Sequence, residues 1–370
     1  MTGIQGGWDF AFAPDGQTIF FTERCRGLSV RMSNGTVARL FGTAGSNLQA
    51  SDFVCEGQSG MNGVAVDPDF NNNRFVYVYM ASSASNPRTN RVIRLTIGAD
   101  MASASSRTEI IDNISYKTLP TAAGGAGLNS GGRIRFGPDD FLYVTTGDNH
   151  DGALPQDLSR LGGKVLRVDR NGAGARGNNV PFGGDARIYT YGHRNVQGIS
   201  FRGGNRVFIS EHGPNHSDEV TRLVAGGNGG WDPQARLFIA CPDNYCGDSG
   251  NSLTMPMTDV LRFPNAMQPS WTNGGLSQGM GASEFLADKR WRGWENRLAV
   301  AFMGAQRLAI LRMNNDDEVT STTDLIGLPA DRYRSLVLGP DGNLYILAEN
   351  AGEIWRITPG NGDNGDAPVP

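Results

Sequence analysis

A short unit recurs along the chain and limits what the chain can fold into: an apolar strand, a turn of the Pro-Asp-Gly kind, and a second apolar strand. Clear copies begin at Phe10, Val64, Ile134 and Leu336, and weaker copies occur at Ile199 and around Trp294. Alternating apolar residues on either side of Pro, Gly and Asp predict β-hairpins, because Pro and Gly interrupt a helix. Six copies of such a unit predict six small antiparallel sheets.

Small sheets that repeat in this way favour an all-β protein, a six-bladed β-propeller with four-stranded antiparallel blades, in which each blade is buried against its neighbours. The pattern leaves a β-sandwich or two β domains as the alternative. We place the propeller at residues 1–358, with long insertions at Gly124–Ser130 and Asp232–Leu286, where loops on a rigid scaffold often carry sites. Residues 359–370, rich in Gly, Asp and Pro, are predicted to be a disordered tail or linker.

The composition agrees with a fold rich in turns. The chain has 51 Gly and 18 Pro among its 370 residues, too many for a mainly helical protein. A net charge of −4 gives no reason to expect nucleic acid or an anionic membrane as a partner. No apolar run approaches the roughly 18 residues that a membrane-spanning helix needs, so we expect no membrane span.

Four cysteines fall into two close sets, Cys25 with Cys55 and Cys241 with Cys246. Their spacing lacks the C-x-x-C pairs of a zinc site, so disulfides are favoured over free buried thiols. Disulfides are typical of oxidising compartments. We therefore expect a periplasmic or secreted protein. The N-terminus shows no signal-peptide pattern, so such a protein would be in its mature form, and a cytosolic protein is the alternative.

Three segments place arginine, amide and imidazole side chains next to repeat strands. They are Tyr191–Gly198, Glu211–Glu219 and Asp331–Arg334. Arginines that converge from different blades on the centre of a propeller would bind a multiply anionic ligand, because guanidinium groups pair with carboxylates through two parallel hydrogen bonds. Ion pairs with neighbouring surface carboxylates are the alternative for each segment taken alone.

Several motifs in one order carry a resemblance. They are Gln58-Ser-Gly-Met-Asn-Gly, Gly131-Gly-Arg-Ile-Arg-Phe-Gly-Pro-Asp, Thr146-Gly-Asp, Leu161-Gly-Gly-Lys, Gly192-His-Arg-Asn-Val-Gln-Gly, Glu211-His-Gly-Pro, Ser217-Asp-Glu and Arg332-Tyr-Arg. With them, nearly the whole chain resembles the soluble quinoprotein glucose/sorbosone dehydrogenase family, six-bladed propellers that bind pyrroloquinoline quinone (PQQ) and Ca²⁺.

The resemblance implies a role for each matching residue. PQQ would be bound by Arg194, Arg332 and Arg334, with amide hydrogen bonds from Asn195 and Gln197. The calcium ion would be held by the backbone carbonyls of Gly213 and Pro214, beside Asp218 and Glu219, for which plain surface charge is the alternative. Gln58 would lie on the substrate side. Hard oxygen ligands suit Ca²⁺.

The chain departs from the family at its catalytic base. The family has a histidine four residues before the arginine of the Gly-Gly-Arg motif, and Asn129 stands there in this chain. An amide can orient a hydroxyl but does not act as a base near neutral pH. Asp148, which orients that histidine in the family, is kept, whereas the lysine that contacts PQQ elsewhere aligns near Gly304.

Three functions therefore follow from the sequence. The first is a dehydrogenase that oxidises an aldose-type sugar to its lactone by hydride transfer to PQQ and passes electrons to an unidentified external acceptor. It would use another base, for which His150 is the nearest candidate, although a histidine in an exposed turn explains that residue as well. The second is a propeller that binds PQQ or a sugar without turnover. The third is a calcium-dependent lactonase or hydrolase on the same fold.

Overall fold

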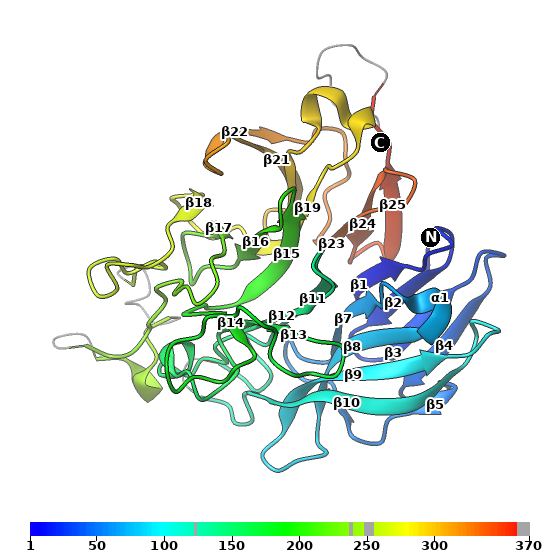
Figure 1. Cartoon of the computed structure of the whole chain (residues 1–370), viewed down its shortest axis with the longest axis horizontal. Helices are drawn as coiled ribbons and strands as arrows, with labels where there is room; N and C mark the ends of the chain where they lie inside the picture. The colour runs from blue at the N-terminus through cyan, green and yellow to red at the C-terminus, as the bar shows by residue number, and fades with distance from the viewer. Residues whose placement is uncertain (122–123, 237–239, 248–254, 361–370) are drawn as a thin grey trace.

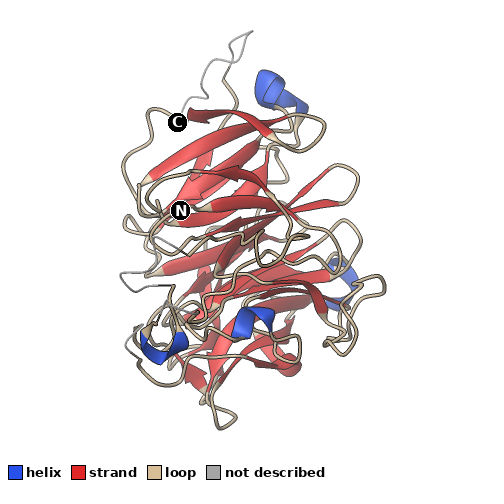
Figure 2. Cartoon of the chain, turned by 90° about the vertical axis from the view of Figure 1, so that its left-hand side faces the viewer, coloured by secondary structure: helices blue, strands red, loops and turns tan. Residues whose placement is uncertain are grey.

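The protein is a six-bladed β-propeller, as the repeats predict. The computed structural model describes residues 1–121, 124–236, 240–247 and 255–360. Six sheets lie around a central axis, and the chain visits them in order, so that the first and last sheets lie side by side (Figure 1). A side view shows the strands running through the body of the molecule, with loops and a few short helical segments around them (Figure 2).

Blades 1 to 3 occupy the N-terminal half of the chain. Blade 1 contains β1 (Gly7–Phe12), β2 (Ile19–Glu23), β3 (Gly27–Arg31), β4 (Val37–Gly42) and the short parallel strand β5 (Leu48–Gln49). Blade 2 contains β7 (Met61–Val66), β8 (Phe75–Ser82), β9 (Thr89–Ile97) and β10 (Ala104–Ile114), with β6 (Phe53–Val54) paired to the end of β8. Blade 3 contains β11 (Gly131–Phe136), β12 (Leu142–Thr146), β13 (Lys164–Val168) and β14 (Ile188–Tyr191).

Blades 4 to 6 complete the ring. Blade 4 contains β15 (Val196–Arg202), β16 (Arg206–Glu211), β17 (Glu219–Arg222) and β18 (Pro269–Thr272). Blade 5 contains β19 (Met280–Phe285), β20 (Leu298–Phe302), β21 (Arg307–Met313) and β22 (Val319–Asp324). Blade 6 contains β23 (Tyr333–Leu338), β24 (Leu344–Ala348) and β25 (Glu353–Ile357). The helical segments described are α1 (Phe70–Asn73), η1 (Leu154–Gln156), η2 (Pro242–Asn244) and η4 (Lys289–Trp294).

The N-terminal segment closes the ring against blade 6. The backbone N–H groups of Ile4 and Ile354 donate to the carbonyls of Gly352 and Met1, each at 2.9 Å. The buried Ile4 side chain packs with Phe10 of blade 1 and with Leu347 of blade 6. The first residues of the chain therefore join the last blade to the first.

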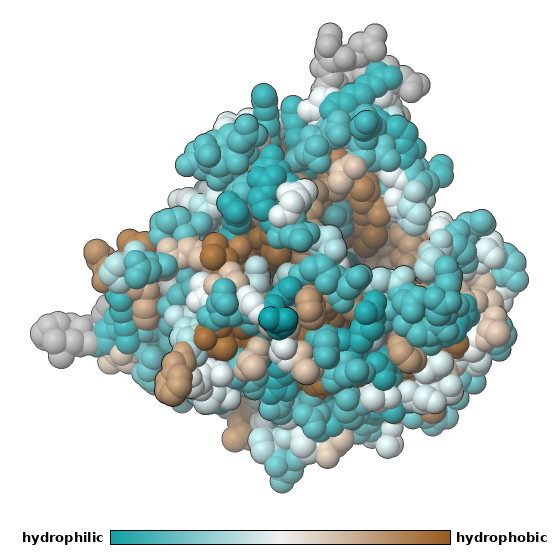
Figure 3. All heavy atoms as spheres, in the orientation of Figure 1, coloured by the Kyte–Doolittle hydropathy of each residue, from teal (hydrophilic) through white to brown (hydrophobic). Residues whose placement is uncertain are grey.

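Apolar contacts between successive blades form the core. One cluster brings together Phe20 of blade 1 and Val78 of blade 2, and a comparable cluster lies at each of the following boundaries. This arrangement follows from the strand pattern, because successive side chains point to opposite faces and both faces of a blade are covered. Much of the face shown in Figure 3 is hydrophilic, with hydrophobic residues exposed in patches.

The repeated turns show why the hairpins form where the sequence predicts them. In blade 1, Asp15 Oδ1 accepts hydrogen bonds from the backbone N–H groups of Gln17 (2.9 Å) and Thr18 (2.8 Å). In blade 6, Asp341 Oδ1 accepts in the same way from Asn343 at 3.1 Å. Gly342 follows Asp341 with φ +68°, a left-handed conformation that glycine adopts without steric cost.

A buried polar cluster lies where the innermost strands meet. Asp9 on β1 accepts two hydrogen bonds from Arg135 on β11, at 2.7 and 2.9 Å, and one from Ser335 on β23 at 2.7 Å. Arg133 on β11 pairs with Asp9 and lies over the Trp8 ring, 4.3 Å from its centroid. Three blades are therefore held together at the axis by charge-assisted hydrogen bonds.

Two predicted boundaries differ from the structure or extend beyond its described residues. The proposed insertion Asp232–Leu286 is too long, because β18 and β19 lie within it; the short polar β18 gave no clear apolar alternation. The predicted tail 359–370 lies outside the described residues apart from Pro359 and Gly360.

Both predicted disulfides, Cys25–Cys55 and Cys241–Cys246, are formed. None of the helices in the described part of the chain has the length and apolar character needed to span a membrane.

Candidate active site

A cavity of about 330 Å³ lies at one end of the central axis. It is lined by residues at the start of the first strand, or just after the end of the second strand, of successive blades. These two positions lie at the same end of an antiparallel hairpin, and therefore at the same end of the propeller. All six blades contribute residues to the lining. The lining includes Trp8, Arg24, Gln58, Ser130, Asn195, Gln197, His212, Met303, Arg332, Arg334 and Glu349.

The structure thus brings five of the predicted ligand-binding residues together. Gln58 from blade 2, Asn195 and Gln197 from blade 4, and Arg332 and Arg334 from blade 6 all line the same cavity. Trp8, Arg24, His212 and Glu349 were not predicted. His212 belongs to the Glu211–Glu219 segment, but no role was predicted for it. The other three residues reach the cavity through closure of the ring, and no local motif marked them.

Positive charge in this cavity exceeds negative charge. Glu349 accepts hydrogen bonds from Arg334 Nε and Nη2 at 3.0 and 2.8 Å and lies 3.5 Å from Arg332 Nε. Burial lowers the pKa of Arg334, Glu349 opposes that shift, and the charges of Arg332 and Arg24 lower the pKa further. The described lining therefore contains three guanidinium groups and one carboxylate, which favours an anionic ligand.

The two amide side chains are held in fixed orientations. Asn195 Oδ1 accepts from the backbone N–H of Gly131 at 3.1 Å and from Gln197 Nε2 at 2.9 Å. With its oxygen occupied, Asn195 presents its NH₂ group as a donor. The donor set of arginines and amides fits a ligand that carries several carboxylate or carbonyl oxygens, as PQQ does.

Arg194, predicted as a third cofactor ligand, is not among the residues that line this cavity. Its side chain is 4% exposed, and Nη1 donates to the carbonyl of His212 at 3.0 Å. The Glu211 carboxylate holds this turn by accepting from the backbone N–H groups of Arg194 and Asn195 and by pairing with His193 at 3.0 Å. Glu211 is therefore a structural residue of the site, a role that the sequence did not assign to it.

The proposed catalytic residues surround one buried carboxylate. Asp148 Oδ1 accepts from Asn129 Nδ2 at 2.9 Å and from the His150 backbone N–H at 3.0 Å. Asp148 Oδ2 accepts from Trp231 Nε1 and from the Tyr245 hydroxyl, both at 2.8 Å. Four donors fix this carboxylate, so it can orient the Asn129 side chain as it would orient a histidine at that position.

Asn129 and His150 lie in different surroundings. Asn129 is buried and, like Arg194, is not among the residues that line the central cavity; its backbone N–H donates to Oε1 of the lining residue Gln58 at 3.1 Å. The His150 ring instead stacks on Tyr245, with centroids 4.8 Å apart, and lines a second cavity of about 560 Å³. The structure does not bring the His150 side chain to the central cavity.

In the predicted calcium segment, Gly213 and Asp218 form hydrogen bonds within the protein. Nδ1 of His212 lies 2.7 Å from the Gly213 carbonyl oxygen, and Pro214 lines a separate surface cavity. Asp218 accepts from the Gly213 N–H (2.9 Å), and also from Ser277 Oγ and the Gln278 N–H, both at 2.7 Å.

Glu219, the fourth predicted calcium residue, is buried. Burial and then the charges of Glu211 and Asp218 raise its pKa to about 8, and Thr258 Oγ1 donates to it at 3.1 Å. No group of three His, Cys, Asp or Glu side chains in the described ranges is placed to hold a metal ion. The described side chains therefore form no carboxylate cluster for Ca²⁺, and the Gly213 carbonyl already has a hydrogen-bond partner.

The chain is similar in sequence to known sugar dehydrogenases. Residues 4–356 match the family model described as glucose/sorbosone dehydrogenase. The chain is 26% identical to aldose sugar dehydrogenase YliI of Escherichia coli K12, with 96% of this chain and 90% of that protein covered. It is also 26% identical to quinoprotein glucose dehydrogenase B of Acinetobacter calcoaceticus, with 93% and 83% covered.

Solved structures share the fold. A glucose dehydrogenase matches with a TM-score of 0.80 at 25% identity, covering 96% of this chain and 97% of that one. The PQQ-bound form of aldose sugar dehydrogenase from Streptomyces coelicolor matches with a TM-score of 0.71 at 24% identity, covering 99% and 93%.

Proposed function

The chain belongs to the glucose/sorbosone dehydrogenase family, and on this premise we propose that it is a PQQ-dependent dehydrogenase that oxidises an aldose-type sugar to its lactone. The observation that carries the proposal is the excess of guanidinium groups in the central cavity. Arg332 and Arg334 share Glu349 beside the amides of Asn195 and Gln197. Such a set binds several carboxylates at once, and PQQ carries three.

The residues of the chain would then divide the work of binding. Arg332 and Arg334 pair with carboxylates, and Asn195 and Gln197 donate to ligand oxygens. Gln58, which lines the cavity and accepts a hydrogen bond from the Asn129 backbone N–H, would orient a sugar hydroxyl. The chemistry that PQQ supplies when bound is acceptance of a hydride from the anomeric carbon.

The chain has no general base at the family position for removal of the hydroxyl proton. The amide of Asn129 can accept a hydrogen bond from the anomeric hydroxyl, but it cannot take the proton. Loss of a positioned general base typically lowers the rate by about 10²–10⁴-fold. We therefore expect slow turnover, with the proton passing to water. The same observation favours a second candidate, a propeller that binds PQQ without useful turnover.

Reconstitution with the cofactor tests both candidates. Apo-protein would be titrated with PQQ, and dye reduction would be followed over a panel of aldoses. PQQ binding with measurable lactone formation supports the dehydrogenase, whereas tight binding without turnover supports the second candidate. Absence of PQQ binding would overturn both, and lactone hydrolysis in its place would point to a hydrolase.

Calcium and location are further parts of the proposal. Because the Gly213 segment offers no ready-made ion site, no catalytic step is assigned to Ca²⁺; reconstitution with and without Ca²⁺ measures whether the ion is needed.

The two disulfides support an oxidising compartment, periplasmic or extracellular. Alkylation of thiols in freshly lysed cells, followed by mass spectrometry, tests whether the cysteines are paired in the native producer.

A further inference from the structure

Arg24 is a charged cavity residue that no sequence motif identified. It follows β2, and its backbone is fixed by hydrogen bonds with Gly6 and Met61, both at 2.8 Å. Its side chain lines the central cavity. Nη1 donates to the carbonyls of Gly57 at 2.6 Å and Ser59 at 3.3 Å. Nε and Nη2 make no hydrogen bond within the described part of the chain, so they are available to a ligand.

The charge of Arg24 has no carboxylate partner among the described residues. Glu349, the acidic residue of the described lining, is already shared by Arg334 and Arg332. The carbonyl acceptors of Arg24 fix its direction without neutralising it. A guanidinium that is held in place and not neutralised is well suited to bind a carboxylate.

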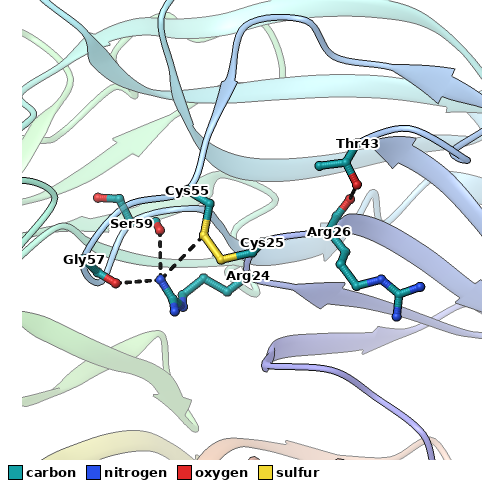
Figure 4. Close-up of a disulfide and its surroundings, with 7 residues drawn as sticks. All are labelled: Arg24, Cys25, Arg26, Thr43, Cys55, Gly57 and Ser59. Atoms are coloured by element: carbon teal, nitrogen blue, oxygen red, sulfur yellow. Dashed lines mark hydrogen bonds between the residues drawn. A yellow bond between two sulfur atoms is a disulfide. The ribbon is translucent and has the colours of Figure 1, made fainter.

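A disulfide holds Arg24 in this position. Cys25 is the next residue, and its partner Cys55 lies two residues before Gly57. Arg24 Nη1 lies 3.7 Å from Cys55 Sγ, and Figure 4 shows the guanidinium reaching from the Cys25 side to the Gly57 and Ser59 carbonyls. The bridge therefore joins the turn that carries Arg24 to the loop that supplies its acceptors.

The fit between these two segments is close. A Cβ at Gly60 would clash with the backbone oxygen of Arg24 and would lie 2.7 Å from Arg24 Cγ. Gln58, which lies between the two acceptor residues, also lines the cavity. Arg26, only two residues along, extends away from this region and pairs with Glu23 at 3.1 Å (Figure 4). Arg26 therefore provides a matched control.

We propose that Arg24 is a carboxylate-binding residue of the central cavity and that the Cys25–Cys55 disulfide is what keeps its guanidinium directed there. The inference rests on the proposed function, since the carboxylate belongs either to PQQ or to an acidic sugar. Arg24 would be the residue that contacts the ligand, and the disulfide would affect binding only by positioning Arg24.

The first experiment compares Arg24→Gln with Arg26→Gln. Apo-proteins of matched circular dichroism and melting temperature would be titrated with PQQ, followed by tryptophan fluorescence, because Trp8 lines the cavity. We expect about 10–100-fold weaker PQQ binding for R24Q, the loss of a charge-assisted hydrogen bond, and an unchanged Kd for R26Q. Unchanged PQQ binding in R24Q, with a selective loss of glucuronate oxidation relative to glucose, would assign the carboxylate to the substrate. No change in either measurement overturns the proposal.

A double-mutant cycle tests the positioning role of the disulfide. Cys25→Ala/Cys55→Ala should weaken PQQ binding in the wild-type background and have no further effect in the R24Q background. Equal losses in both backgrounds would show that the disulfide does not act through Arg24.

Titration with benzene-1,3,5-tricarboxylate, which has no quinone, separates this inference from the proposed function. Weaker binding of that anion by R24Q than by R26Q supports the role of Arg24 even if the wild type does not bind PQQ. Equal binding of the anion by both variants counts against the role.

Discussion

Asn129 stands where the proposed function would place a catalytic base. It has φ +45°, a conformation that asparagine, aspartate and histidine adopt more readily than other side chains. The Asn129 Nδ2 group donates a hydrogen bond to Asp148 Oδ1 at 2.9 Å. A histidine at this position could donate to the same carboxylate and present its other ring nitrogen as a base, because a carboxylate partner fixes the tautomer.

Replacement of Asn129 by histidine is therefore expected to raise kcat/KM by about 10²–10⁴-fold in PQQ-loaded protein, the usual contribution of a general base. The gain should be lost below a pH of about 6.5, where the imidazole becomes protonated. Asn129→Gln is the control, since it keeps an amide and adds no base. If N129H binds PQQ as tightly as the wild type and gains no activity, proton removal does not limit turnover.

A second prediction at this scale concerns acid stability. Burial alone would raise the pKa of Asp52, but hydrogen bonds from Arg107 and Ser82 and the charge of Arg107 lower it to about 2. Arg107 reaches both carboxylate oxygens, at 2.6 and 2.8 Å. A depressed pKa means that the folded state holds this proton less tightly than the unfolded chain. The stabilisation is therefore present above a pH of about 4 and is lost as the pH falls towards 2.

Asp52→Asn should consequently lower the free energy of unfolding at pH 6 by about 1 kcal/mol, a value reduced for the partial exposure of the pair. At pH 2 the difference from the wild type should have largely disappeared. Urea unfolding at the two pH values gives this difference, and Asp316→Asn, at an exposed site, is the control. A difference that stays constant with pH would contradict the assignment.

At the scale of elements, the two disulfides differ in the length of chain that they close. Cys25–Cys55 spans 30 residues between blades 1 and 2, and Cys241–Cys246 spans only 5. A cross-link restricts the unfolded chain more when its loop is longer, by about 3–4 kcal/mol for the first loop and about 2 kcal/mol for the second.

We therefore expect Cys25→Ala/Cys55→Ala to lose more stability than Cys241→Ala/Cys246→Ala. Urea denaturation of both double variants beside the wild type measures the two losses. A larger loss for the Cys241–Cys246 pair would mean that the contacts of its neighbour Tyr245 with Asp148 outweigh the effect of loop length.

The success of the sequence prediction also differs between elements. Hairpins with Pro, Asp and Gly in their turns were predicted because the turn and the alternating strands are encoded within about a dozen residues, as at Asp15 and Asp341. The strand β18 was missed because four residues with two polar side chains give no alternation. The side-chain direction of Arg194 is set by the His212 carbonyl, a contact that spacing along the chain does not reveal.

In the whole molecule, ring closure decides which residues meet in the cavity. Trp8 and Arg24 come from blade 1, whereas Arg332, Arg334 and Glu349 come from blade 6, more than 300 positions away in the sequence. Motifs could identify the blade 6 arginines one segment at a time. Arg24 and Glu349 needed the closed ring, since they face the ligand only when the first and last blades touch.

Ile4 is the residue whose loss should weaken this closure most directly. It is 5% exposed and packs between Phe10 and Leu347, while its N–H donates to Gly352 across the boundary. Ile4→Ala should lower the free energy of unfolding by about 2–5 kcal/mol, as truncation of a buried isoleucine usually does. The loss should appear in the single main unfolding transition, because each blade is supported by both neighbours.

Ile326→Ala is the matched control for this variant, since Ile326 is 78% exposed and its truncation should change stability by less than about 0.5 kcal/mol. Ile4→Ala should also weaken PQQ binding, because Arg24 and the blade 6 arginines lie on opposite sides of the boundary that Ile4 seals. Urea unfolding and PQQ titration of the two variants measure both effects. A stability loss in Ile4→Ala with unchanged PQQ affinity would show that the cavity keeps its shape without a tight closure, and equal stability of the two variants would show that Ile4 does not seal the ring.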